Sequence, residues 1–314
     1  MIAVRDLHVR FKAARAVDGV SLDWRPGEVL GVVGESGCGK STLARAMLGL
    51  VPPASGAVEL DGAPVGDRAA WRALRRRVQM VFQDPYQTLN PRMRVRTIVS
   101  EPLVIQGTPV GEHAARVDRA LEDVGLPPDR FADRFPHELS GGQRQRVAIA
   151  AALVLDPDGL ICDEPVSMLD VSVRAQVLKV LMDLRTSRSL ALLFITHDLG
   201  LAWALCDRIA VMYLGRIVEQ GAAHHVIEHP RHPYTQALVA AVPAPDRERG
   251  GRLVAGEPPD AANIPSGCRL HPRCPHRFEP CDREDPPLFD TGEDGHRAAC
   301  LLLSPGLSSG SARA

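Results

Sequence analysis

The fold of this chain is decided by the stretch Gly34-Glu35-Ser36-Gly37-Cys38-Gly39-Lys40-Ser41-Thr42, which fits the phosphate-binding pattern G-x-x-x-x-G-K-[ST]. A short apolar run at Val29–Val33 precedes it, and an apolar helical pattern over Ser41–Leu50 follows it. The pattern requires this order of strand, glycine-rich loop and helix, which makes a chance glycine turn the weaker reading. The sequence therefore predicts a loop whose backbone N–H groups cradle phosphate, supported by the positive end of a helix dipole.

The residue types of this phosphate loop divide the binding task among them. Glycines let the backbone come close to a ligand without a clash from Cβ. We expect Lys40 to meet the β- and γ-phosphates of a nucleotide and the Ser41 hydroxyl to bind Mg²⁺. The predicted nucleotide contacts are Gly34, Glu35, Ser36, Gly37, Cys38, Gly39, Lys40, Ser41 and Thr42.

A second piece of the site is Leu160-Ile161-Cys162-Asp163-Glu164-Pro165, an apolar strand that ends in two adjacent carboxylates. Neighbouring acids repel each other unless a cation or a proton offsets their charge. A bound magnesium ion supplies such a cation. An Asp-Glu pair alone is weak evidence, and the apolar strand in front of it and the helix behind it are what favour a site.

A third piece is Leu139-Ser140-Gly141-Gly142-Gln143. Ser140 is a favourable N-cap for a helix over Gly141–Leu155. Its hydroxyl, the glycine N–H groups and the helix dipole all favour an anion. The chain thus has two helix ends that attract phosphate, one at Ser41 and one at Ser140.

These motifs, in this order, resemble those of the ATP-binding cassette (ABC) ATPases that drive ABC transporters. The resemblance implies that Asp163 holds Mg²⁺ and that Glu164 polarises the attacking water. Gln83 would sense both Mg²⁺ and that water, and His197 would contact the γ-phosphate. The implied catalytic residues are Glu164, His197 and Gln83, and the implied magnesium residues are Ser41, Gln83 and Asp163.

The same resemblance adds nucleotide contacts from three places outside the phosphate loop. Phe11 lies where the family stacks an aromatic ring on adenine, the alternative being a core aromatic at a strand end. Ser140, Gly141, Gly142 and Gln143 would close on the nucleotide of a neighbouring subunit in a head-to-tail dimer. Asp170 closes Ser167-Met168-Leu169-Asp170, and Met168 departs from the alanine usual there, which puts details of the coupling in doubt.

The predicted fold class is α/β: an ABC-type P-loop ATPase with a mostly parallel core sheet, an inserted helical subdomain and a small Cys/Pro-rich C-terminal extension. We assign residues 1–225 to the ATPase domain, about 86–155 to its helical subdomain and 226–314 to the extension. The expected strands are Val29–Val33, Val78–Phe82, Leu160–Cys162, Leu190–Thr196 and Arg208–Tyr213. The expected helices are Ser41–Leu50, Ala114–Val124, Ser140–Leu155 and Val171–Thr186, with a last short helix that ends at Val242.

Longer stretches resemble the ATP-binding subunits of dipeptide/oligopeptide (and nickel) importers, most closely the second of their two ATPases. These stretches are Phe82–Arg92, Cys162–Ser167 with Leu169–Ser172, His232–Thr235 and the tail from Gly267. The resemblance implies a second ATPase subunit, with a homodimer as the alternative, two membrane permeases and an external substrate-binding protein. Residues Tyr86–Arg94 would meet a permease, or form an ordinary surface loop. Nickel or another small solute is an alternative cargo, and a soluble ABC protein without a transport role is a more distant alternative.

Composition limits the remaining classes. The chain has 314 residues, 45% of them hydrophobic, and a formal net charge of −1, so no broad basic field attracts nucleic acid. The basic cluster Arg72–Arg77 is typical of a solvated helix face. The longest apolar run, Val147–Leu155, is about half of the roughly 18 residues that a membrane span needs. We therefore expect a soluble cytoplasmic protein that lies peripherally on the cytoplasmic face of the membrane through its partners.

Four of the seven cysteines gather near the C-terminus at Cys268, Cys274, Cys281 and Cys300. Their spacings match neither the paired C-x-x-C of common zinc ribbons nor the usual ferredoxin run. Spacing alone leaves the ligand open. The importer resemblance adds a [4Fe-4S] cluster as the expected cofactor. Zinc, with His271 or His276 recruited, and reduced metal-free thiols are the alternatives.

Overall fold

The structure is a computed structural model that describes residues 1–242, 256–257 and 259–304. Two compact units interleave along the chain. The first unit comprises Met1, Trp24–Glu28 and Val65–Phe194, and the second comprises Ile2–Asp23, Val29–Pro64 and Ile195–Ala314.

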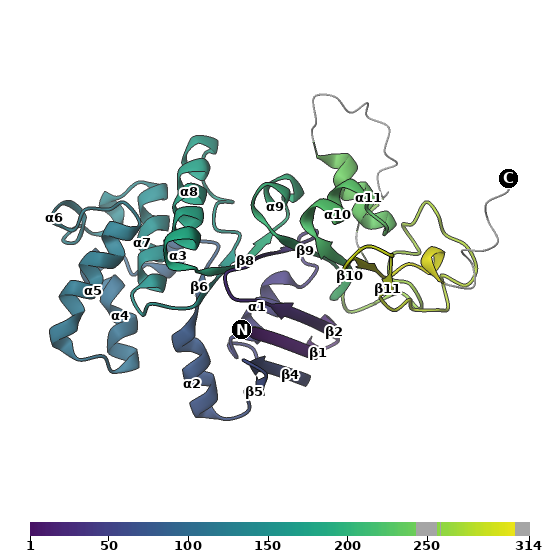
Figure 1. Ribbon diagram of the computed structural model, residues 1–314, viewed down its shortest axis with the longest axis horizontal. Helices are drawn as coiled ribbons and strands as arrows, with labels where there is room; N and C mark the ends of the chain where they lie inside the picture. Colours follow the sequence, from purple (N-terminus) through teal and green to yellow (C-terminus); the bar gives the residue numbers. More distant parts are fainter. Residues whose placement is uncertain (243–255, 258, 305–314) are drawn as a thin grey trace. The chain divides into compact units, whose positions relative to one another are not determined.

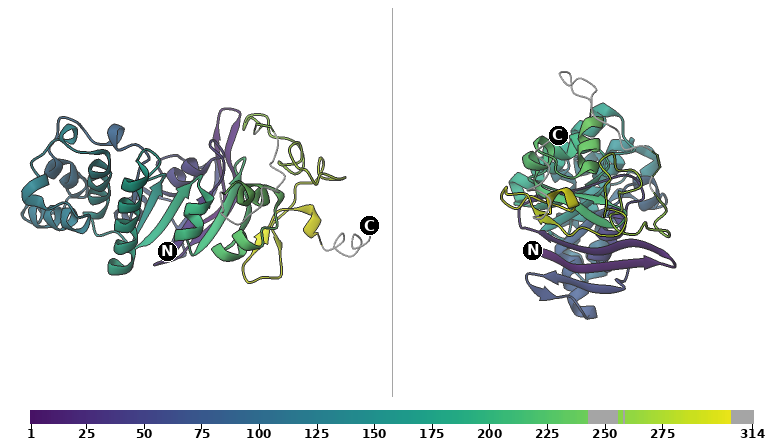
Figure 2. Two further views of the ribbon diagram at one scale, coloured as in Figure 1. Left: turned by 90° about the horizontal axis from the view of Figure 1, so that it is seen from above. Right: turned by 90° about the vertical axis from the view of Figure 1, so that its right-hand side faces the viewer.

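An antiparallel sheet at the N-terminus belongs to the second unit. It has the strand order β2-β1-β4-β5, and Figure 2 shows β1, β2 and β4 lying side by side. The strands are β1 (Ile2–Phe11), β2 (Ala14–Trp24), β4 (Ser55–Leu60) and β5 (Ala63–Pro64). Apolar residues of β1 such as Val4, Leu7 and Val9 are completely buried, so one face of this sheet packs on the core.

The second unit also holds the strand before the phosphate loop. Strand β3 (Val29–Val33) pairs in parallel with β9 (Arg208–Tyr213), and β9 pairs antiparallel with β10 (Arg216–Ala222). All five residues of β3 are buried, as a strand covered on both faces requires. The bounds expected for β3 and β9 are confirmed. The helices of this unit are α1 (Lys40–Met47), α9 (Leu199–Leu205), α10 (Ala223–Glu228) and α11 (Pro233–Ala241).

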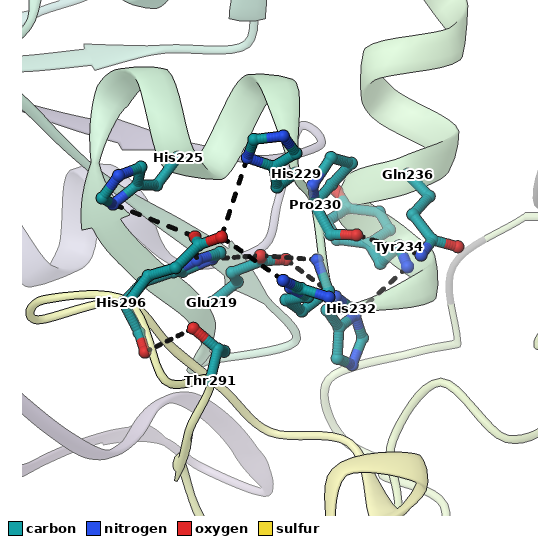
Figure 3. A network of polar contacts seen from close by, with 11 residues as sticks. Glu219, His225, His229, Pro230, His232, Tyr234, Gln236, Thr291 and His296 are labelled. Atoms are coloured by element: carbon teal, nitrogen blue, oxygen red, sulfur yellow. Dashed lines mark hydrogen bonds and ion pairs between the residues drawn. The ribbon is translucent and has the colours of Figure 1, made fainter.

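The C-terminal extension joins the edge of this same unit. Strand β12 (Arg297–Ala298) pairs antiparallel with β10 and with β11 (Phe289–Asp290), and the short helix η2 (Leu301–Leu303) follows. Two residues per strand give few ladder bonds, so side chains contribute much of the attachment. The buried carboxylate of Glu219 accepts hydrogen bonds from His296 Nε2 (2.7 Å) and from the backbone N–H groups of Arg231 (2.8 Å) and His232 (2.9 Å) (Figure 3).

The first unit contains the strand that carries the acidic pair. Strand β6 (Val78–Val81) pairs in parallel with β7 (Gly159–Asp163), and β8 (Ala191–Thr196) crosses into the second unit at its last two residues. Helix α2 (Arg68–Arg77) buries only Leu74, which confirms the solvated face expected for Arg72–Arg77. Helix α8 (Val171–Arg188) is two residues longer than expected. Parallel pairs in both units confirm the predicted α/β fold.

A group of helices fills the remainder of the first unit. Helices α4, α5 and α7 pack against one another (Figure 1), with Leu103, Leu121 and Val147 completely buried. These helices occupy the stretch of about residues 86–155 that the sequence predicts to be mainly helical, and its standing as a subdomain stays a prediction. Its members are α3 (Pro85–Thr88), α4 (Val95–Gln106), α5 (Val110–Asp123), α6 (Pro128–Phe131), η1 (Pro136–Glu138) and α7 (Gly141–Leu153). Among the described residues, no helix combines the length and the apolar character that crossing a bilayer demands.

Candidate nucleotide site

The phosphate loop connects β3 to α1 in the second unit, as the sequence predicts. Gly39 is the N-cap of α1 with φ 105°, in the left-handed region that favours glycine. A Cβ at Gly39 would lie 2.0 Å from the carbonyl oxygen of Ala16, and one at Gly34 would lie 2.1 Å from that of Met212. Because these neighbours are backbone atoms, they cannot yield. The two glycines therefore let the loop pack against adjacent strands, a reason beyond the expected approach to a ligand.

Lys40 lies at the start of α1 with its side chain drawn back over the loop. Its Nζ donates hydrogen bonds to the carbonyl oxygens of Gly34 (2.8 Å) and Glu35 (2.9 Å). Helix α1 has no acidic residue in its first turn, so its positive dipole end keeps its attraction for anions. Burial raises the pKa of the neighbouring Cys38 thiol, although the Lys40 ammonium acts against that rise. The loop thus combines a fixed cation, a helix end and a neutral thiol.

Glu35 ties the phosphate loop to distant parts of the second unit. Its backbone N–H donates to the hydroxyl of Tyr234 on α11 (2.8 Å), and its carboxylate meets the guanidinium of Arg273 in the extension (3.1 Å). Sequence reasoning noted Tyr234 only within a family motif and missed Arg273. Neither partner lies near Glu35 in the sequence, so no local pattern could indicate either contact.

The acidic pair lies at the end of β7 in the first unit. Asp163 is buried, and Glu164 follows it with φ 45°, a conformation that costs about 1–2 kcal/mol for a residue with a Cβ. Such strain is typical of functional sites. Gln83 Nε2 donates to Glu164 Oε2 over 3.1 Å, so the structure brings these two predicted catalytic residues together. The side-chain and backbone donors of Ser167 hold the carbonyl oxygen of Glu164 (3.1 and 3.2 Å).

The chemistry of these donors fits magnesium. Mg²⁺ prefers oxygen ligands, and the predicted set offers a hydroxyl at Ser41, an amide oxygen at Gln83 and a carboxylate at Asp163. Gln83 uses the NH₂ side of its amide toward Glu164, so its oxygen is the atom suited to a cation. Burial, together with the negative charge of Asp163, raises the pKa of Cys162 to about 12.

The Leu139–Gln143 run opens α7 in the first unit. Ser140 is its N-cap: Ser140 Oγ accepts from the backbone N–H of Gln143 (3.3 Å), and Gln143 Oε1 accepts from that of Ser140 (3.0 Å). This reciprocal capping box confirms the expected cap. A Cβ at Gly142 would lie 2.3 Å from Val173 Cγ1, so the glycine also permits close packing of α7 on α8.

An aromatic contact joins α7 to the segment after Gln83. The guanidinium of Arg144 lies over the ring of Tyr86 at 4.2 Å from its centroid, a favourable cation–π geometry. Tyr86 is otherwise exposed. The segment expected to meet a permease thus contacts α7, the helix that Ser140 caps, and both lie within the first unit.

The remaining predicted residues are exposed. Phe11, at the end of β1, is 49% exposed, so it does not belong to the core. His197 follows β8 in the second unit, and Asp170 is the N-cap of α8 in the first. The roles of these three residues toward a nucleotide stay predictions.

The four clustered cysteines lie in the second unit as free thiols. Burial raises the pKa of Cys268 to about 11 and that of Cys300 to about 12, so both thiols are protonated near neutral pH. The backbone N–H of Cys268 donates to the carbonyl oxygen of Cys281 (2.8 Å). Within the described ranges, no three or more His, Cys, Asp or Glu side chains are arranged to hold a metal ion. The residues as placed therefore do not fit the expected cluster.

Two protein families match the chain. The family described as ABC transporter matches residues 17–167, and the family described as oligopeptide/dipeptide transporter, C-terminal region, matches residues 218–281.

Curated relatives and solved structures agree with these matches. A peptide import ATP-binding protein of Brucella abortus (strain 2308) is 50% identical over 92% of this chain and 86% of its own length. A peptide import ATP-binding protein of Brucella ovis is 45% identical over 96% of this chain and 97% of its own length. Among solved structures, cbiO1 from Clostridium perfringens, part of an ABC transporter complex, has a TM-score of 0.66 at 33% identity over 73% of this chain and 90% of its own. The dimeric ATP-binding cassette MJ0796, in a post-hydrolysis state bound to ADP and Pi, has a TM-score of 0.63 at 28% identity. The match covers 71% of this chain and 99% of the MJ0796 chain.

Proposed function

Because this chain belongs to the ABC transporter family, among the ATP-binding proteins with an oligopeptide/dipeptide transporter C-terminal region, we propose that its ATP hydrolysis powers peptide import. In this proposal it is a translocase subunit bound peripherally at the cytoplasmic face of the membrane. Its partners are two permeases, an external substrate-binding protein and a second ATPase subunit, or a second copy of itself. Nucleic acid has no part in it.

The observation that carries the proposal is the Gln83–Glu164 contact at the end of β7. A carboxylate that follows a buried strand in a strained conformation, with an amide 3.1 Å away, is arranged to orient a small polar molecule. Water attacking a γ-phosphate is such a molecule. Glu164 would accept its proton, and Gln83 would fix its position.

The other residues bind and hold the nucleotide in this proposal. The N–H groups of residues 34–42 and the α1 dipole would hold the phosphates, while Lys40 would turn from its carbonyl acceptors toward them. Phe11 would stack on adenine, and His197 would meet the γ-phosphate. Bound Mg²⁺ would offset phosphate charge beside Ser41, Gln83 and Asp163.

Ser140 gives this chain a second phosphate-seeking helix end. We propose that it serves the nucleotide of the neighbouring subunit, together with Gly141, Gly142 and Gln143, while Asp170 lies near the contact. The γ-phosphate would then hold two subunits together, and its loss would release them. The dimeric solved cassette supports a paired arrangement.

The experiment that tests the proposed transport uses the complete complex in vesicles. Permeases, binding protein and ATPases are reconstituted into vesicles. ATP is supplied on the side of the membrane that carries the ATPases, and the uptake of labelled di- and oligopeptides to that side is measured. We expect uptake with the parent chain and none with Lys40→Ala. Uptake of nickel but not of peptides would favour the alternative cargo, and ATP hydrolysis without any uptake would contradict the transport function.

The metal content of the extension is a separate proposal. Four thiolates match the ligand count of a [4Fe-4S] cluster, but the described side chains are not placed as a metal site. Iron–sulfur, zinc and reduced thiols stay as the three alternatives. Anaerobic purification followed by visible absorbance and metal analysis separates them: brown colour with iron indicates the cluster, zinc alone the second, and neither metal the third.

A further inference from the structure

The carboxylate of Glu35 has a paired partner in the C-terminal extension. Arg273 Nη1 lies 3.1 Å from Glu35 Oε2, and Nη2 lies 3.2 Å from Oε1, so the pair is bidentate. Such a fork-to-fork contact adds geometric specificity to charge attraction. The Arg273 side chain is only 8% exposed, which distinguishes this pair from a surface ion pair.

Two buried tyrosines contact the same pair. Arg273 Nη1 also donates to the Tyr213 hydroxyl (3.2 Å), and the Tyr213 ring lies 4.7 Å from the ring of Tyr234. Tyr234 in turn accepts the backbone N–H of Glu35 (2.8 Å). Both tyrosines are buried. The contacts form a closed ring that holds Glu35 by its backbone and by its side chain.

The charge of Glu35 makes this ring matter for nucleotide binding. A carboxylate in a loop that must accept a triphosphate has the unfavourable sign. The Arg273 guanidinium offsets that charge at short range, and burial strengthens the effect because screening by water is reduced. Residues of the same extension, Pro259 and Ala261, line a cavity of about 210 Å³ with Glu35 and Gly37, so the extension covers this side of the loop.

We propose that Arg273 is a positioning residue of the nucleotide site, through which the C-terminal extension sets the affinity for ATP. It neutralises Glu35 and fixes the first turn of the phosphate loop. This inference rests on the proposed function of residues 34–42 as the ATP site. It assigns to the extension a contribution to nucleotide binding besides any metal or partner that it holds.

The test compares Arg273→Met, Glu35→Gln and the double variant with the parent chain. Arg283→Met is the matched control, because Arg283 belongs to the same extension but pairs with Glu279 at the surface. ATP Kd is measured by calorimetry at low and high salt, and KM and kcat by phosphate release. We expect Arg273→Met to raise Kd and KM about tenfold at low salt, less at high salt, with kcat within about twofold.

Rescue separates a charge effect from a folding effect. Without the Glu35 charge nothing needs offsetting, so the double variant should bind ATP within about threefold of Glu35→Gln alone. If Arg273→Met does not fold, as judged by circular dichroism, Arg273→Lys replaces it: a point charge that keeps the neutralisation but loses the fork should weaken ATP binding about threefold.

Two results would overturn the inference while leaving ATP binding by the parent intact. One is parental ATP affinity in folded Arg273→Met. The other is a loss that Glu35→Gln does not rescue, which would make Arg273 a structural support only. A parent chain that fails to bind ATP would instead overturn the proposed function itself.

Discussion

The phosphate loop and the C-terminal extension are held in place in opposite ways. The loop lies between a completely buried strand and a helix that begins at Lys40, and its own backbone supplies the acceptors for that lysine. The extension has two-residue strands and is attached by charged contacts. Arg269 pairs with Asp18, 251 residues away, and His296 with Glu219, 77 residues away. Local apolar sequence builds the strand and helix that frame the first region, although Glu35 of the loop also makes long-range polar contacts, and long-range polar pairing attaches the second.

The largest effect is expected in the phosphate loop. Lys40→Ala removes the cation that the loop holds over its own carbonyls, and with it the charge-assisted bonds expected with ATP. We expect ATP affinity to fall at least about 100-fold, measured by calorimetry. Lys179→Ala is the control, since Lys179 lies on the exposed face of α8 beside Asp183. Equal affinity in parent and Lys40→Ala would remove the phosphate-loop assignment.

The next largest effect is expected in the C-terminal extension, at its buried ion pair between Arg269 and Asp18. Arg269 and Asp18 are both buried, and Arg269 also donates to the carbonyl oxygen of Leu214. Arg269→Met leaves the Asp18 carboxylate in the interior without its closest cation, with His8 (2.9 Å) and the half-exposed Arg15 (3.7 Å) still beside it. We expect the free energy of unfolding in urea to fall by about 3 kcal/mol.

The matched variant for this prediction is Arg283→Met, which breaks an exposed pair and should change stability by less than about 1 kcal/mol. Addition of Asp18→Asn to Arg269→Met should recover part of the loss, because no charge is then left buried. If both arginine variants were equally stable, the extension would not depend on its buried ion pair.

The smallest effect concerns His232 and His296 of the network in Figure 3, whose pKa values are shifted in opposite directions from the usual histidine value. Burial lowers the pKa of His232 to about 4, and its Nδ1 accepts the N–H of Tyr234 (3.1 Å). Burial also acts to lower the pKa of His296, but its bonds with Glu219 and Glu293 outweigh burial and leave that pKa above its usual value.

Stability should therefore decline on both sides of about pH 6.5, the usual histidine value. As pH falls from 6.5 toward 4, His232 binds a proton in the unfolded state but not in the native state, so the native state loses stability relative to the unfolded state. As pH rises through the raised pKa, native His296 loses the proton that stabilised its pairs. We expect His232→Gln to reduce the acid decline and His296→Gln the alkaline decline, each by a few degrees in melting temperature. Persistence of the full alkaline decline in His296→Gln would contradict this assignment.

The same contrast explains what the sequence could predict. The bounds of Val29–Val33 and Arg208–Tyr213 followed from short apolar runs, and the helix cap at Ser140 followed from the preference of serine for the N-cap position. Helix α5 begins at Val110, four residues before the expected start. Its N-cap is Pro109, which makes no side-chain capping bond, so no Ser, Thr, Asp or Asn at the N-cap position marks this start.

Side-chain pairs remote in sequence were beyond such reasoning. The contact of Glu35 with Arg273 spans 238 residues, and no periodicity or spacing encodes it. The Gln83–Glu164 contact spans 81 residues and was expected only through family resemblance. The four cysteines were recognised as a cluster, but their spacing did not determine whether their thiols converge on a metal.

Glu164 is the residue proposed to activate water, and one measurement tests that role directly. Glu164→Gln keeps the size of the side chain and the contact with Gln83 while removing the base. With Mg²⁺ and ATP, alone or mixed with its partner ATPase, we expect ATP affinity within about twofold of the parent and hydrolysis at least about 100-fold slower. The ATP-loaded variant should sediment as a dimer. Hydrolysis at the parental rate would contradict the role of Glu164 in activating water.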